Sequence, residues 1–348
     1  MEEVVASNAA RREVDTPNGS GKSLKAPLGL PFPVFLVIGF LSTISCARAD
    51  SPEGHRRVFV FRHCFRSTPA SSSHAVPEFE HMLNYTNKGT LPPWNTPTKW
   101  CTEGGWKISS GTGSDLASRF VPDGGTVSII SDTSMRCSDT ALAILRGLGE
   151  GVRPIHYDAP IFHALEPDVG PAACQASFTD DDLVSAARER LDTVPTPTEY
   201  SEAYSLFERL LGIGVAGPLG NLSPVASVSS SGHLFGVVGA LKRLSQMLFY
   251  SYASGAPWVS GASTDDLYNL IAWQHYFRSV NSINVETATN NAQLLKRILN
   301  TLGSTDSSDT TIFVGHDSNI DGMATLLNLN WEAPPYKGGA LLPSPPNS

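Results

Sequence analysis

Short apolar runs and longer amphipathic stretches alternate along this chain. Three runs rich in β-branched or aromatic residues occur at 58–61, 126–130 and 310–314. Each is continuously apolar, which is typical of strands buried on both faces of a parallel sheet. Apolar residues recur with helical spacing at about 180–191, 199–213, 234–252, 265–280 and 289–302, and Ser114 is suited to cap a helix over 115–120.

Most of these helical stretches lie between the second and third apolar runs. We therefore predict an α/β fold, with a central, mainly parallel sheet flanked by helices and a mainly helical cap insertion. The α/β core is expected over 50–150 and 286–348, and the cap over 151–285. Residues 1–49 form an N-terminal extension.

The N-terminal extension has the features of a signal peptide. Basic residues precede the apolar segment "LGLPFPVFLVIGFLSTIS", and 47–49 form a small-x-small cleavage sequence. We predict a secreted or lumenal/vacuolar protein, with membrane attachment only if the segment stays uncleaved as a signal anchor. Asn84 and Asn221 begin glycosylation sequons, although Pro224 makes the second a poor acceptor.

Composition indicates a globular chain that does not bind nucleic acid. The 348 residues are 41% hydrophobic and carry a formal net charge of -8. An anionic ligand must therefore be attracted by a local cluster of positive charge. Cleavage after Ala49 would leave four cysteines, which allow two disulfides in any of three connectivities. No cysteine or histidine pair has the spacing of a zinc site.

Charged and polar side chains follow all three predicted strands. Ligands of open α/β sheets bind outside the carboxyl ends of the strands, so these side chains should share one pocket. Three guanidinium groups in such a pocket favour phosphate, which they can bind through paired hydrogen bonds. The residues are Arg62, His63 and Arg66 after the first strand, Asp132 and Arg136 after the second, and His316 and Asp317 after the third.

The pattern Arg-His-x-x-Arg-x-x-Pro at 62–69, followed by His-Asp at 316–317, resembles the histidine acid phosphatases. The likeness extends through most of 57–340 and is greatest to the branch that contains bacterial acid phosphatases and phytases. Further similar segments are "GGWKISSGTGSDLASRF", "LYNLIAWQHYFR" and "LNWEAPPYKGGALL". The resemblance implies a phosphoglycerate mutase-like fold.

The resemblance also implies a role for each residue. His63 would attack phosphorus and form a phosphohistidine. Asp317 would protonate the leaving group and then activate water, which fits activity at acidic pH. No metal or cofactor is expected, because positively charged side chains neutralise the phosphate. The phosphate-binding residues would be Arg62, Arg66, Arg136 and His316.

Two features depart from this family. Cys64 stands where glycine is usual, so the loop is either strained or modified by a disulfide. Cys64 and Cys137 each follow a residue expected to contact the phosphate, which suggests that they pair; the alternative is two separate thiols. Cys101 and Cys174 would then be the remaining pair. The chain ends in "GGALLPSPPNS", where the family continues, so the core is expected to be C-terminally truncated.

The sequence thus predicts a secreted acid phosphatase that hydrolyses small phosphomonoesters. Cys64 and the truncation favour a catalytically impaired phosphate- or inositol-phosphate-binding protein as an alternative. A phytase is a further alternative, disfavoured because 67–73 contains no lysine. Secretion disfavours a phosphate-transferring mutase.

Overall fold

The structure of the chain is a computed structural model. It describes residues 38–40, 56–67, 96–97, 99–121, 125–149, 152–162, 179–211, 220–223, 225, 227–228, 234–254, 261–281, 285–304 and 308–329. The Asn84 sequon, Cys174, the C-terminal stretch and all of the signal segment except 38–40 lie outside these ranges. No helix within them is long and apolar enough to span a bilayer.

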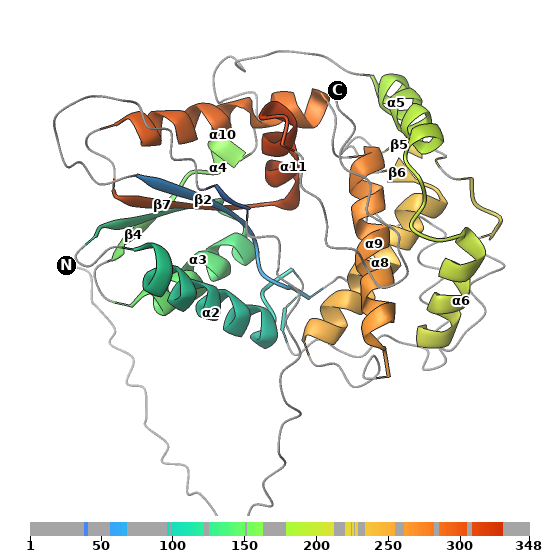
Figure 1. The fold of residues 1–348 in the computed structure, drawn as a ribbon, viewed down its shortest axis with the longest axis horizontal. Helices are drawn as coiled ribbons and strands as arrows, with labels where there is room; N and C mark the ends of the chain where they lie inside the picture. Colours follow the sequence, from blue (N-terminus) through green and yellow to red (C-terminus); the bar gives the residue numbers. More distant parts are fainter. Residues whose placement is uncertain are drawn as a thin grey trace, which may run out of the picture. The chain divides into compact units, whose positions relative to one another are not determined.

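A mainly parallel sheet organises the core, which confirms the predicted α/β fold class (Figure 1). Its described strands have the order β1-β2-β7-β3-β4, and among them only β1 runs antiparallel, pairing with β2. β2, β3 and β7 confirm the three strands predicted from apolar runs. The strands are β1 (Ile38–Phe40), β2 (Arg57–Arg62), β3 (Val127–Ser131), β4 (Val152–Tyr157) and β7 (Thr310–Gly315).

Helices cover both faces of this sheet (Figure 1). Successive strand residues point to opposite faces, so β2, β3 and β7 each contribute to two hydrophobic clusters. Phe59 and Ile129 pack with α2 (Glu103–Phe120) and α3 (Met135–Leu148). Val60 and Ile130 pack with α4 (Ala159–Phe162), α10 (Val285–Gly303) and α11 (Asp317–Leu326).

Strand β4 was not predicted, because residues from 151 onward were assigned to the helical insertion. Its sequence "VRPIHY" contains Arg153 and Pro154, which interrupt the apolar run. Proline cannot donate a hydrogen bond to a neighbouring strand and is tolerated at sheet edges. Among the described strands, β4 is the last in the sheet order and is paired on one side only.

The expectation that Ser114 caps a helix is wrong. Helix α2 begins at Glu103, with the Thr102 side chain accepting a hydrogen bond from Gly105 N. The Ser114 hydroxyl lies in the middle of α2 and donates to Gly147 O of α3 at 3.1 Å. Glycines in this segment permit close contact: a Cβ on Gly113 would lie 2.2 Å from Ile144 O.

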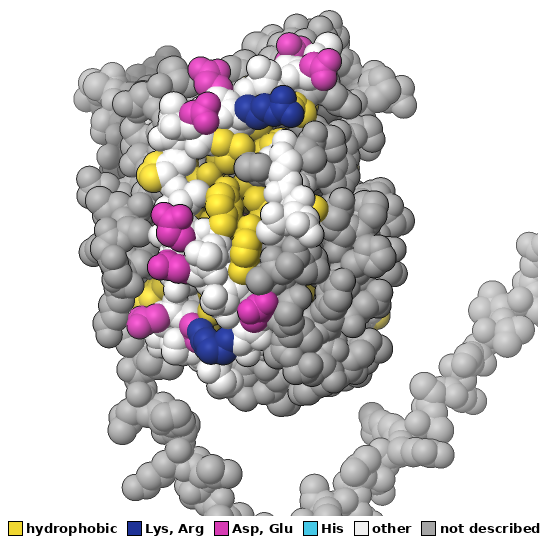
Figure 2. All heavy atoms as spheres, turned by 90° about the vertical axis from the view of Figure 1, so that its right-hand side faces the viewer, with side chains coloured by type: hydrophobic (Ala, Val, Ile, Leu, Met, Phe, Trp, Pro, Cys, Tyr) yellow, Lys and Arg dark blue, Asp and Glu magenta, His cyan; other side chains and the backbone are white. Residues whose placement is uncertain are grey.

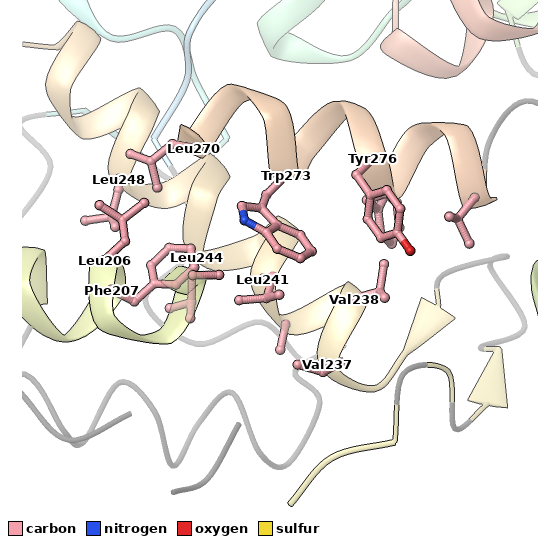
Figure 3. Close-up of a cluster of buried hydrophobic side chains, with 14 of the residues drawn as sticks. Leu206, Phe207, Val237, Val238, Leu241, Leu244, Leu248, Leu270, Trp273 and Tyr276 are labelled. Atoms are coloured by element: carbon pink, nitrogen blue, oxygen red, sulfur yellow. The ribbon is translucent and has the colours of Figure 1, made fainter. Parts of the chain in front are cut away.

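In the described residues of the insertion there are four long helices and a short antiparallel pair of strands. The helices agree with the predicted stretches within a few residues, although 234–235 form a strand. Their core surrounds Trp273, Leu241 and Phe207, all fully buried (Figure 3). The elements are α5 (Asp180–Thr193), α6 (Tyr200–Leu211), β5 (Ser227–Val228), β6 (Leu234–Phe235), α8 (Val237–Ala253) and α9 (Thr264–Asn281).

A shallow surface hollow of about 480 Å³ lies against α6 and α9 of the insertion. Its lining includes Glu202, Arg209 and Asp266, and the last two form an ion pair. On the face drawn in Figure 2, acidic side chains surround exposed apolar ones. The arginine in the hollow is neutralised by Asp266, so this hollow does not suit an anionic ligand.

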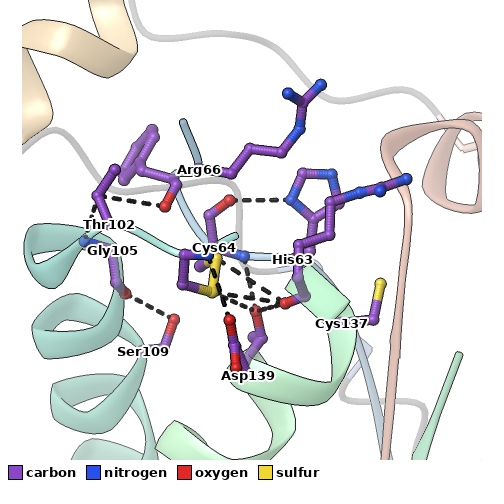
Figure 4. The surroundings of a disulfide bond; sticks show 12 residues. His63, Cys64, Arg66, Thr102, Gly105, Ser109, Cys137 and Asp139 are labelled. Atoms are coloured by element: carbon purple, nitrogen blue, oxygen red, sulfur yellow. Dashed lines mark hydrogen bonds between the residues drawn. A yellow bond between two sulfur atoms is a disulfide. The ribbon is translucent and has the colours of Figure 1, made fainter. Parts of the chain in front are cut away.

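The observed disulfide joins Cys64 to Cys101, which corrects the suspected Cys64–Cys137 pairing and leaves Cys101 unable to pair with Cys174. The backbone explains the choice, because Arg66 and Cys101 form an antiparallel bridge that aligns their segments. Cys137 is a buried free thiol. Its sulfur lies 3.4 Å from Gly315 O, whereas the disulfide lies on the side of Thr102 and Asp139 (Figure 4).

The contact between α2 and α3 can be tested with two glycine substitutions. Gly111→Ala should stabilise the protein by about 0.5–1 kcal/mol, because its Cβ meets nothing within 4 Å and alanine loses less backbone entropy on folding. Gly113→Ala should destabilise it by ~1–3 kcal/mol, because α2 and α3 must separate. Urea denaturation measures both; equal stability of the two variants would contradict the close packing.

Replacing both Cys64 and Cys101 with alanine should lower the free energy of unfolding. The bond closes a loop with a sequence separation of 37. Its loss should cost about 2–4 kcal/mol by the chain-entropy argument. A reductant should lower the thermal midpoint of the wild type but leave the double variant unchanged. Recovery of a Cys64–Cys137 peptide from unreduced protein would refute the assignment.

Candidate active site

The ends of β2, β3 and β7 bring the predicted site residues together. Arg62 at the end of β2 is level with Gly315 of β7, and Ser131 of β3 pairs with Val314. Backbone hydrogen bonds continue this alignment, since His63 N donates to Gly315 O at 2.9 Å and Asp132 N donates to Val314 O at 3.0 Å. The three segments that follow β2, β3 and β7 therefore begin side by side, at the carboxyl ends of these strands.

The loop after β2 is fixed by contacts with α3. Cys64 N donates to Thr140 Oγ1 at 2.8 Å, and that hydroxyl donates to Arg136 O at 2.6 Å. The disulfide attaches the same loop to Cys101 (Figure 4). Among the described non-glycine residues, only Lys99 and Asn328 have positive φ. Cys64 thus occupies the position usual for glycine without the expected backbone strain.

His63 lies in this loop and is 6% exposed. Its Nδ1 is 2.9 Å from Cys64 O, and because a carbonyl only accepts, Nδ1 carries the hydrogen (Figure 4). Nε2 therefore holds the lone pair. Burial lowers the pKa of His63, and the charges of Arg62 and Arg136 lower it further, well below the ordinary value. The imidazole is thus neutral and suited to act as a nucleophile.

His316 begins the chain segment after β7 and faces His63, with ring centroids 5.5 Å apart. Its Nε2 lies 2.9 Å from the buried Asp132 carboxylate, and its Nδ1 lies 3.3 Å from Arg136 Nη2. Asn319 Oδ1 accepts from the His316 backbone N at 2.7 Å. Burial lowers the pKa of His316 despite the hydrogen bond with Asp132. Asp132 therefore orients this ring, a role that the sequence did not predict.

Asp317 is the first residue of α11 and lies 3.5 Å from Arg62 Nε. Burial favours its neutral form, but Arg62, Arg278 and Lys242 outweigh this effect and hold its pKa well below the ordinary value. Arg278 of α9 donates Nε hydrogen bonds to both carboxylate oxygens of Asp321, at 3.0 and 3.1 Å. It also donates to Asp317 O at 3.4 Å. The insertion therefore contributes directly to the site.

The remaining positive charges lack enough carboxylates to balance them. Burial and the charges of Arg136 and Arg62 lower the pKa of Arg66 to about 10. In the described part of the chain, Nε of Arg66 and Nε of Arg136 are buried without a hydrogen-bond acceptor. Lys242 of α8 lies in the same field, and burial lowers its pKa to about 8. Buried unpaired donors are costly, so this arrangement favours an anion.

One group of described side chains has donor atoms close enough for a metal ion. Atoms of Asp132, Cys137 and His316 lie within 4.8 Å of one another. Burial, however, raises the pKa of Cys137 to about 12, so the sulfur stays protonated. His316 Nε2 is already paired with Asp132. These contacts give no support for a metal site.

The residues from the insertion, Arg278 and Lys242 above all, were not identified from the sequence. Arg278 ends the segment "LYNLIAWQHYFR", which was assigned to the cap without a role for any side chain. An arginine near the end of an apolar helix is commonly exposed, so its position alone gave no reason to choose it. Its partner Asp321 lies one helical turn after Asp317, and this spacing was the available clue.

No family model and no curated protein match this sequence. Solved structures do match. A phytase from Hafnia alvei in complex with tartrate has a TM-score of 0.64 and 20% identity, covering 80% of this chain and 76% of its own. A Citrobacter braakii phytase gives 0.63 and 21%, with 80% and 76% covered. A Klebsiella sp. ASR1 phytase gives 0.62 and 16%, with 85% and 77% covered. This chain has the fold of these phytases.

Proposed function

We propose that the protein is a phosphatase of the histidine acid phosphatase family that hydrolyses phosphomonoesters through a phosphohistidine. The observation that carries the proposal is the neutral His63, whose Nε2 lone pair is available beside three arginines at the sheet edge. The family motifs at 62–69 and 316–317 and the shared fold of the phytases support the same function.

In the first step, His63 Nε2 attacks phosphorus as the bond to the leaving oxygen breaks. Arg62, Arg66 and Arg136 stabilise the negative charge on the other phosphoryl oxygens. The leaving oxygen takes a proton from Asp317 and departs as an alcohol. In the second step, water attacks the phosphohistidine, Asp317 accepts its proton, and phosphate and free His63 are released.

Because Asp317 is ionised in the ligand-free protein, it must gain a proton before it can protonate the leaving oxygen. Without an anion, the positive charges around Asp317 keep it deprotonated even at acidic pH. A phosphomonoester has its second pKa near ~6, so at lower pH it brings one proton with it. Its negative charge also offsets that of Arg62 and Lys242, which raises the pKa of Asp317. Substrate binding thereby allows Asp317 to act as an acid.

His316 is proposed to donate to a phosphoryl oxygen through Nδ1. In the ligand-free arrangement, Arg136 lies 3.3 Å from this atom. A phosphoryl anion would draw the guanidinium toward itself and favour protonation of His316, while Asp132 keeps the opposite nitrogen in place. Arg136 and His316 would then both donate to the phosphate.

A phytase is the second candidate, favoured by the position of α8. The loop after β2 has no lysine, but Lys242 and Arg243 of the insertion lie close enough for their charges to influence one another and Arg66. Such charges suit a substrate with several phosphates. Conversely, the unstrained backbone at Cys64 removes one reason to propose a catalytically impaired binding protein.

Secretion is proposed on two grounds. The sequence at 1–49 has signal-peptide features, and disulfides persist mainly in oxidising compartments. Cleavage after Ala49 would also remove β1 and leave β2 at the edge of the sheet. Asn221 is exposed, as a glycosylation site requires.

His63→Ala should abolish turnover of p-nitrophenyl phosphate at acidic pH, because no covalent intermediate can form. The matched control is His156→Ala, which alters an exposed histidine of β4. Wild-type protein quenched during turnover with labelled substrate should carry acid-labile phosphate on His63. Normal turnover without any labelled histidine would exclude the proposed mechanism.

Asp317→Asn should reduce turnover of an alkyl phosphate by about 10²–10⁴-fold, because an alkoxide leaves poorly without a proton. The loss with p-nitrophenyl phosphate should be smaller in the bond-breaking step, since nitrophenolate is a stable anion. Single-turnover kinetics isolate this step, and the exposed Asp265→Asn serves as control. Equal losses with both substrates would show that Asp317 is not the general acid.

A further inference from the structure

Helix α8 directs a line of polar side chains toward the phosphate-binding loop. Lys242, Gln246 and Tyr250 are spaced four residues apart, so they lie along one side of the helix. Tyr250 is fully buried. Its ring contacts the Phe65 ring edge-on, with centroids 5.4 Å apart, and the guanidinium of Arg62 lies 5.3 Å from its centroid. Tyr250 therefore stands beside the first phosphate-binding arginine.

The Tyr250 hydroxyl receives two hydrogen bonds. Arg62 Nη2 donates one, and Gln246 Nε2 donates the other at 3.0 Å. A phenolic oxygen accepts through its lone pairs and has a single hydrogen to give. No acceptor for that hydrogen occurs among the residues that the structure describes. A buried hydroxyl with this hydrogen unpaired is costly, and a phenylalanine would fill the same space without that cost.

The other side of Arg62 is also occupied. Its Nε lies 3.5 Å from Asp317 Oδ2, while Nη2 contacts Tyr250. The hydrogen bond to Tyr250 and the attraction of the Asp317 carboxylate, which gives Nε no hydrogen bond, hold the guanidinium and leave Nη1 for an anion. A phosphoryl group bound there would lie next to the Tyr250 hydroxyl, which still has its hydrogen to donate.

We propose that Tyr250 is a further substrate-binding residue of this site, which holds Arg62 in position and donates its hydroxyl hydrogen to an oxygen of the phosphoryl group. This inference rests on the proposed phosphatase function and adds to it a contact from the helical insertion. Hydrogen bonds to charged acceptors are stronger than neutral ones, so the contact should be measurable.

The test is Tyr250→Phe, which keeps the ring against Phe65 and removes only the hydroxyl. Titration calorimetry with inorganic phosphate should show affinity about 10-fold weaker than that of the wild type. Tyr276→Phe is the matched control, because it removes a buried hydroxyl that bonds Tyr200 within the insertion core. That control should bind phosphate like the wild type even if its thermal midpoint falls.

Phosphate binding is measured without turnover, so it separates this inference from the proposed reaction. Wild-type protein that binds phosphate but hydrolyses no ester would overturn the proposed function, while a weaker Tyr250→Phe complex would still support the Tyr250 contact. With an active enzyme, Tyr250→Phe should raise KM more than it lowers kcat. Unchanged phosphate affinity in Tyr250→Phe, with or without a lower thermal midpoint, would overturn the inference and leave a structural role.

Discussion

The buried ion pair between Arg278 and Asp321 is the contact on which the geometry of the site depends. Asp321 is 2% exposed, and a carboxylate there would be very unfavourable without a partner. Arg278 belongs to α9 of the insertion, and Asp321 belongs to α11 of the core. The pair thus joins the two parts at the helix that begins with Asp317. Because Asp317 in turn contacts Arg62, the position of the insertion affects how the Arg62 guanidinium lies.

The cost of burying an ionised side chain without a partner also explains how charge is distributed at the carboxyl ends of the strands. Burial lowers the pKa values of Arg62 and Arg66, and repulsion from the neighbouring arginines lowers them further. Asp132 pairs with His316. Asp317 and Asp321 offset part of the charge, and the excess is available to an anion. A chain with a net charge of -8 therefore concentrates positive potential in one place, where it favours an anion.

The three central strands and the convergence of residues at their ends followed from continuous apolar runs and from the geometry of parallel sheets. β4 could not be predicted in this way, because Arg153 and Pro154 interrupt its apolar run. The disulfide was assigned wrongly for a different reason. Cys64 and Cys137 each neighbour a residue predicted to contact phosphate, but adjacency in sequence does not fix the direction of a side chain. On the first turn of α3, the Cys137 sulfur faces β7, away from Cys64.

Helix α8 shows why the contribution of the insertion could not be predicted. Leu241, Leu244 and Leu248 enter the hydrophobic core of the insertion, so Lys242, Gln246 and Tyr250 occupy another side of the helix (Figure 3). Amphipathic patterns assign such polar residues to solvent. Here that side meets Phe65 and Arg62 instead, and Gln246 and Tyr250 are buried. A sequence pattern separates the apolar side of a helix from its polar side. It does not show whether the polar side faces water or a polar site, and here residues on the polar side of α8 contact the site.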